Sequence, residues 1–212
     1  MGLNEAVVRL AGYLLSLDRF DEAETLIRGA VADDPRNGEF EKFSYRIAVC
    51  RKLATQDAGA KEAIAKHPSD PAPYRLLFSS YMARQKSVEA AQLFGQLLSH
   101  IEVTPEEIAN TAHAFADQGE AYLVEPFLEA NARRHPADGI LLYQAACLHA
   151  LAQHPEAAFR DLAAALAMKD GERIRAALAE DASWSAYRES EGFRKAQEMA
   201  PEKALATPAR KK

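Results

Sequence analysis

Prolines and alanines recur along this chain of 212 residues with a period of about 34, and this period restricts the folds that the chain can adopt. Pro35 and Pro68 are separated by about one period, and Pro136 follows about two periods later. Ala23, Ala90 and Ala158 keep the same phase, with about two periods between neighbours in this series. Such a period is typical of stacked helix pairs. It divides the chain into five repeats: 4–36, 37–70, 71–104, 105–138 and 139–172.

Apolar residues within the repeats have helical spacing. Leu10, Leu14 and Leu17 are three and four residues apart, which predicts that they share one buried face of a helix. A proline after each second helix stops that helix and redirects the chain. Because one helix pair cannot bury its own apolar stripe, neighbouring pairs must stack to complete a core. The sequence therefore predicts an all-α fold of about five helix pairs.

The segment Ser16–Pro35 combines a turn, an acidic helix start, small residues and a closing proline. It resembles the second half of a tetratricopeptide repeat, whose pattern is W-x2-L-G-x2-Y, then A-x3-F, then P. The matching positions in the first repeat are Val7, Leu10, Ala11, Leu14, Ala23, Ile27, Ala30 and Pro35. The resemblance covers residues 4–172 and implies an α–α superhelix. Repeats two and four match less well, since Gln56 replaces an expected alanine and Asn131 occupies a small apolar position.

The repeat phase stops after the fifth repeat. Residues 173–200 predict short helices that close the end of the array, which would otherwise expose an apolar face. We interpret Trp184, Tyr187 and Phe193 as plugs for that core, with an aromatic binding platform as the alternative. Residues 201–212 contain two prolines and no apolar stripe, which predicts a disordered tail.

Local signals predict where some second helices begin. Asp18 and Ser87 precede such helices and are expected to cap them. Pro126 falls inside the expected second helix of repeat four. That helix therefore either starts late, near Val124, or is kinked at the proline.

Charge and composition favour a protein as the partner. The net charge is −5 and the chain has no long basic run, so no nucleic acid is expected as a ligand. No segment approaches about 18 uninterrupted apolar residues, so no membrane insertion is expected, and the first residues do not resemble a signal peptide. Cys50 and Cys147 form neither a disulfide framework nor a metal set, which favours a reducing cytoplasm.

The sequence contains none of the common motifs for catalysis, cofactor binding or metal binding, so no cofactor and no metal is expected. His113 and Cys147 occupy the same position in adjacent first helices, and an imidazole beside a thiol can lower the thiol pKa enough for nucleophilic catalysis. The preferred alternative is that Cys147 packs as a small hydrophobic residue and His113 lines a groove.

In tetratricopeptide proteins the first helices line a concave face that holds an extended peptide or a helix. The resemblance implies a partner-binding set on the same positions here: Tyr45, Arg75, Ser79, Met82, His113, Tyr143 and Cys147. Tyr45, Arg75 and Tyr143 are the expected anchors, because Tyr and Arg are enriched at binding hot spots. The family's clamp for chaperone carboxylates is absent, since its positions hold Val8, Gly12, Lys42, Ala72 and Leu76.

These observations predict a non-catalytic scaffold or adaptor that binds a partner peptide or amphipathic helix in the cytoplasm of a bacterium. The bacterial origin follows from the closing aromatic segment, which is similar to the ends of many bacterial repeat proteins. A chaperone for a secreted or assembled protein is the alternative, and an enzyme with a His113/Cys147 site is the weaker one. Homodimerisation through an exposed repeat face is also compatible with the pattern.

Overall fold

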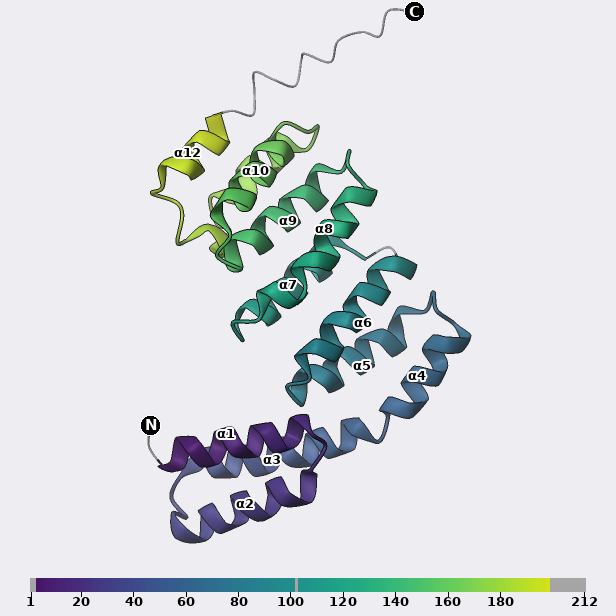
Figure 1. Cartoon of the computed structure of the whole chain (residues 1–212), viewed down its shortest axis with the longest axis vertical. Helices are drawn as coiled ribbons and strands as arrows, with labels where there is room; N and C mark the ends of the chain where they lie inside the picture. The colour runs from purple at the N-terminus through teal and green to yellow at the C-terminus, as the bar shows by residue number, and fades with distance from the viewer. Residues whose placement is uncertain (1–2, 102, 199–212) are drawn as a thin grey trace, which may run out of the picture. The chain divides into compact units, whose positions relative to one another are not determined.

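The regular secondary structure of the chain is helical throughout the residues that the structure describes. A computed structural model describes residues 3–101 and 103–198, and every regular element in these ranges is an α-helix or a short 3-10 helix (Figure 1). The predicted all-α fold class is confirmed. The chain divides into two compact units, Met1–Ile101 and Glu102–Lys212, which we call unit 1 and unit 2. The sequence did not predict this division.

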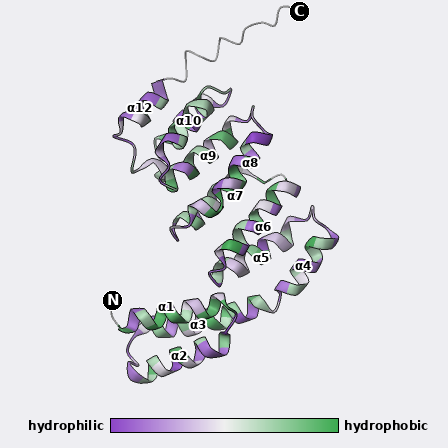
Figure 2. Ribbon diagram, viewed as in Figure 1, coloured by the Kyte–Doolittle hydropathy of each residue, from purple (hydrophilic) through white to green (hydrophobic). Residues whose placement is uncertain are grey.

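Unit 1 contains six helices within residues 3–101. They are α1 (Leu3–Ser16), α2 (Phe20–Asp33), α3 (Gly38–Ala54), α4 (Asp57–Lys66), α5 (Pro71–Ala83) and α6 (Ser87–His100). Helix α1 packs against α2 and α3, and α5 packs against α4 and α6. Hydrophobic and hydrophilic residues are mixed along each of these helices (Figure 2). One core of this unit joins α1, α2 and α3 through buried residues that include Leu15, Ile27, Phe40 and Ile47.

Unit 2 is organised around one apolar helix. Its elements are α7 (Pro105–Ala116), η1 (Ala121–Leu123), α8 (Glu125–Arg134), α9 (Gly139–Leu151), α10 (Pro155–Leu166), α11 (Gly171–Leu178), η2 (Ala182–Trp184) and α12 (Glu191–Glu198). Helix α9 packs against α7, α8, α10, α11 and η2. Because it is surrounded by neighbours, α9 is apolar on nearly all sides instead of along one stripe.

The aromatic residues near the end of the described chain close the core of unit 2. Trp184 is fully buried and its ring centroid lies 5.3 Å from that of Phe193, which is also buried. Tyr187 is partly buried and meets Phe159 edge to face at 5.7 Å. The interpretation of Trp184 and Phe193 as core plugs is confirmed, and an aromatic platform at Trp184 is wrong because its ring is inaccessible. The tail predicted at 201–212 lies outside the described residues.

A left-handed residue recurs in the turns between paired helices. The residues are Asp18, Gln85, Gly119 and Gln153, with φ between 57° and 74°. About two repeat periods separate Asp18 from Gln85, and about one period separates each of the later neighbours. In the first turn the N–H of Arg19 donates to the Leu14 carbonyl at 2.9 Å, and the N–H of Asp18 donates to the Leu15 carbonyl at 3.1 Å. The same two bonds recur in the other three turns, which makes each of them a Schellman motif. The sequence period is therefore also a period of the backbone.

The prediction that Asp18 and Ser87 cap second helices is wrong. The N-cap positions of α2 and α6 are Arg19 and Lys86, and neither side chain makes a capping bond. Side-chain caps instead begin four first helices, each about one repeat period after the last: Asn37, Asp70, Thr104 and Asp138. The chain enters these first helices from extended backbone, where a short polar side chain can reach the free N–H groups, whereas it enters the second helices from a left-handed turn.

The structure also tests the predicted start of α8 and the predicted burial of three leucines in the first repeat. Helix α8 begins at Glu125 with Pro126 in its first turn, so the late start is confirmed and no kink is needed. The shared buried face of Leu10, Leu14 and Leu17 is wrong, because only Leu14 is buried, while the other two are 49% and 46% exposed. The buried residues of α1 are Ala11, Gly12, Leu14 and Leu15, so Leu10 lies outside the buried face and Leu17 lies beyond the end of the helix.

Candidate functional site

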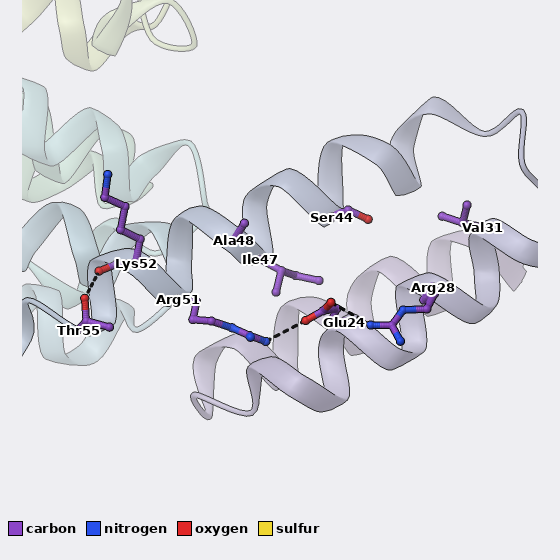
Figure 3. Close-up of a pocket in the computed structure, with 9 residues that line it drawn as sticks. All are labelled: Glu24, Arg28, Val31, Ser44, Ile47, Ala48, Arg51, Lys52 and Thr55. Atoms are coloured by element: carbon purple, nitrogen blue, oxygen red, sulfur yellow. Dashed lines mark hydrogen bonds and ion pairs between the residues drawn. The ribbon is translucent and has the colours of Figure 1, made fainter.

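A groove of about 720 Å³ lies between α2 and α3 in unit 1 (Figure 3). Its lining residues recur every three to four positions along each helix, on α3 partly as adjacent pairs, so two helical stripes face the same space. These residues are Glu24, Arg28 and Val31 from α2, and Ser44, Ile47, Ala48, Arg51, Lys52 and Thr55 from α3 and its end. Such paired stripes are the surface on which a third helix packs.

The groove is open because α4 does not fold back along α3. The second helices α2 and α6 pack along their first helices α1 and α5, but α4 packs against α5 of the next pair (Figure 1). Thr55 and Gln56, between α3 and α4, have φ of −65° and −93°. The left-handed residue that reverses the chain in the other turns is thus missing here, and the position one repeat period after Asp18 is Lys52, still inside α3.

A buried ion cluster attaches the start of α4 to the end of α5. Arg84, at the end of α5, is 1% exposed and donates to the carboxylates of Asp57 and Asp18, the latter at 2.6 Å. Asp57 is the first residue of α4 and also accepts from the Ser80 hydroxyl at 2.7 Å. Lys86 pairs with the other oxygen of Asp18. This cluster holds α4 in the position that leaves the α2–α3 groove uncovered.

The side chains of this cluster stay charged because they pair with one another. Burial alone would raise the pKa of Asp18, but its hydrogen bonds to Lys86 and Arg84 hold the pKa below the ordinary value of 3.8. Burial likewise opposes the charge on Arg84, and Asp57 and Asp18 more than offset it, so that the pKa of Arg84 is raised. Both partners therefore stay ionised in the fold at neutral pH.

The groove carries positive charge on both walls above an apolar floor. Arg28 on α2 and Arg51 and Lys52 on α3 are opposed in the lining only by Glu24, which leaves a net charge of +2 on a chain whose net charge is −5. Glu24 accepts from Arg28 at 2.9 Å and from Arg51 at 3.0 Å (Figure 3). Lys52 is exposed and forms no ion pair among the described residues.

The partner-binding residues predicted in unit 1 lie on α3 and α5, outside the lining of this groove. Tyr45 is 75% exposed, Arg75 and Ser79 are exposed, and Met82 is partly buried. They are accessible side chains of first helices, and their use by a partner stays a prediction. The sequence reasoning missed the α2–α3 groove because it placed binding on first helices alone.

The predicted residues of unit 2 contact the closing segment of the chain itself. Tyr143 and Cys147 are 5% and 6% exposed. The Tyr143 hydroxyl donates to Asp181 at 2.7 Å, and the Cys147 thiol lies 3.5 Å from the same carboxylate. His113, which is partly buried, lies with its Nε2 atom 3.4 Å from the Ser183 hydroxyl. Segment 181–184 therefore occupies the face of α9 on which we expected a partner.

These surroundings are unfavourable for a nucleophilic Cys147. Burial raises the pKa of the thiol, and the nearby Asp181 carboxylate raises it further, so the thiol stays protonated at neutral pH. The polar contacts of His113 and Cys147 lead to different residues, Ser183 and Asp181. Cys147 is instead part of the apolar core around α9 and α10.

Sequence reasoning also missed a buried histidine in unit 2. His149 on α9 is 1% exposed, with Nε2 3.3 Å from Glu125 and 3.2 Å from Glu129 on α8, and Nδ1 3.1 Å from Asp161 on α10. Burial lowers the pKa of His149, but the three carboxylates raise it more, and the net shift is upward. Through these three contacts His149 connects α8, α9 and α10. His154 adds a second contact to Glu125, at 2.6 Å.

No group of three or more His, Cys, Asp and Glu side chains among residues 3–101 and 103–198 is arranged to hold a metal ion. In the same ranges no helix is long and apolar enough to cross a membrane.

The outward face of α1 is the most apolar exposed helix surface in unit 1. Leu3 and Tyr13 are 81% and 59% exposed, beside the exposed Leu10 and Leu17. Leu3 and Leu10 are seven residues apart, so they share one side of the helix, and Leu17 follows directly after its last residue. Homodimerisation through an exposed repeat face stays a prediction, and this side of α1 is the surface that fits it.

Comparison of the chain with protein-family models, with curated proteins and with solved structures found no match. The function is therefore inferred from the geometry of the groove.

Proposed function

We propose that this chain is a non-catalytic protein-interaction module of the tetratricopeptide type, which holds an amphipathic helix of a partner protein between α2 and α3. The observation that supports this proposal most is the open groove where a regular helix pair would place its second helix. From Ser44 to Thr55 the α3 wall is about 16 Å long, which is three helical turns. A partner helix of similar length would complete the packing that α4 leaves unmade.

The tetratricopeptide assignment is supported by three features that share one phase. Alanines of the second helices, caps of the first helices and left-handed turn residues each recur after about one repeat period or two. A scaffold or adaptor role follows from an array whose helix pairs present grooves.

We further propose that the protein works in the reducing cytoplasm of a bacterium. Cys50 and Cys147 are both free and buried, each against the core of a different unit. Such thiols are compatible with a compartment in which disulfides are not needed for stability.

The groove can be tested by blocking it. A photo-crosslinking amino acid at position 48 would identify proteins that enter the groove, and each captured protein would then be titrated against purified wild type and variants. Ala48→Trp fills the space between the walls, whereas Ala58→Trp places the same side chain on the exposed surface of α4 as a matched control. We expect Ala48→Trp to weaken binding at least about tenfold, or ~1.4 kcal/mol, and Ala58→Trp to leave it unchanged. Equal affinities for both variants would show that the partner binds elsewhere.

A further inference from the structure

We infer that the α2–α3 groove selects an acidic amphipathic helix, with an apolar stripe for the floor and Asp or Glu residues on both flanks. This inference rests on the proposed function and names the chemical class of its partner.

The floor of the groove requires an apolar stripe on the partner. Ile47 is buried, Val31 is partly buried, and Ala48 and Ser44 are small and accessible. Small residues at the middle of α3 allow a third helix to approach toward the short end of the usual interaxial range of about 8–10 Å. At that separation, the partner's side chains beside its stripe lie next to the charged residues of both walls.

The walls determine which flanking charges are accepted. Arg28 is 73% exposed at its side chain and Lys52 is exposed, so both can reach a carboxylate without losing most of their hydration. Arg51 already pairs with Asp21 and Glu24, and Glu24 also pairs with Arg28. Since Asp21 and Glu24 together cannot balance three cations, a helix with Lys or Arg flanks would meet uncompensated like charge.

Helix α4 is a poor occupant of the groove. Among its ten residues only Ala60 is buried, against α5, and it carries Lys61 and Lys66. Asp57 and Glu62 balance these two lysines, so α4 offers little apolar surface and no net negative charge to the groove. A separate helix with acidic flanks satisfies both the floor and the walls, so the chemistry favours a partner over the chain's own α4.

The test uses a display library of helical peptides about 16 residues long, or four turns, with a constant Leu/Ala stripe and flanks randomised among Glu, Lys and Gln. Peptides are selected on the full chain, and the pool is then screened for loss of binding to Ala48→Trp. Binding of individual peptides is measured by fluorescence anisotropy against wild type, Lys52→Glu and Arg28→Glu. Lys42→Glu is the matched control, because Lys42 is an exposed lysine of the same helix outside the groove lining.

We expect Glu to be enriched over Lys at the flanks, and each groove charge reversal to weaken acidic peptides about fivefold to tenfold while Lys42→Glu leaves them unchanged. Peptides that require an open groove but show no acidic preference would overturn this inference and leave the proposed function standing. If no selected peptide loses affinity for Ala48→Trp, both the inference and the proposed function are wrong. A dimer of the chain that Ala48→Trp dissociates would overturn the inference, because the occupant would then be a second copy.

Discussion

Replacing Arg84 with methionine should destabilise unit 1 by about 3 kcal/mol, because it removes the cation of a buried ion cluster. Methionine keeps much of the volume of the arginine stem, so the change is mainly electrostatic. Arg84 is fully enclosed, and its guanidinium contacts Asp57, Asp18 and the Ser80 side chain.

The magnitude follows from the exposure of the two carboxylates left behind. The Asp57 side chain is 14% exposed and keeps only the Ser80 hydroxyl, so most of the cost comes from this nearly buried charge. Asp18 is 42% exposed and keeps Lys86, so its loss is small. Breaking a buried pair by deleting one partner usually costs about 3–5 kcal/mol, and the residual hydration of Asp57 places this case at the lower end.

Urea denaturation followed by far-UV circular dichroism measures the loss, and hydrogen exchange locates it. We expect the amides of α4 to exchange faster in Arg84→Met, because Arg84 attaches its first residue to α5. Arg9→Met removes an exposed i, i+4 pair with Glu5 and serves as the control, with an expected loss below about 0.5 kcal/mol.

A double-mutant cycle with Asp57→Ala decides whether the two groups act as a pair. Once Arg84 is absent, removing the Asp57 carboxylate should recover part of the lost stability, so the double variant should cost at least about 1 kcal/mol less than the two single changes together. A loss below about 1 kcal/mol for Arg84→Met, or additive single and double effects, would refute the role assigned to the cluster.

Three further predictions concern unit 2, whose unfolding Trp184, the single tryptophan of the chain, reports by fluorescence. Gln153→Gly should stabilise the protein by about 0.5–1 kcal/mol, because φ is 62° at this position and glycine adopts a left-handed conformation without strain. Gly119→Ala should destabilise it by about 1 kcal/mol, because φ is 74° there. If urea titrations showed the free energy of unfolding changing in the same direction for both variants, backbone strain would not explain the effects. Wild type should be more stable than His149→Gln, and this advantage should be complete below the ordinary histidine pKa of 6.5. The advantage should decline as the pH rises through the higher pKa of His149 in the folded protein, which unfolding experiments at pH 6 and pH 9 would show. An advantage that grows with pH would mean that His149 is neutral in the fold. Cys147 should react with iodoacetamide at least about a hundredfold more slowly in the native than in the urea-unfolded chain, as peptide mass spectrometry would measure, and a fast native rate would restore the nucleophile hypothesis.

The sequence predicted the all-α fold because the repeat period and the helical spacing of apolar residues are properties of short segments. Pro126 shows how far such local reasoning reaches, since proline chemistry alone limited α8 to a late start or a kink. The capping error shows its limit. A short polar residue before a helix caps it only when the chain enters from extended backbone, and the left-handed turn at Asp18 does not provide that geometry.

The groove could not be predicted from the sequence, because it depends on contacts between residues that are far apart in the chain. Asp57 and Arg84 are far apart in the sequence, and their pairing became visible only in the packed structure. Repeat two did carry one signal in its sequence, the mismatch at Gln56. Lys52 occupies the position that is left-handed in the other turns, but that backbone period became visible only in the structure. The cluster around His149 was unreadable for the same reason as the groove, because its carboxylates come from two other helices.

The open groove and the buried ion cluster have a common origin in the length of α3. This helix has 17 residues, whereas α1 has 14 and α5 has 13, so the chain leaves α3 about one helical turn later than the period requires. The late exit carries Asp57 to Arg84 instead of returning it along α3. A buried ion cluster contributes less stability than well-packed apolar residues of the same volume. Each buried charge nevertheless requires its particular partner, so the cluster restricts the way in which the helices can pack. The cluster therefore fixes the position of α4, and this position exposes the walls of the groove.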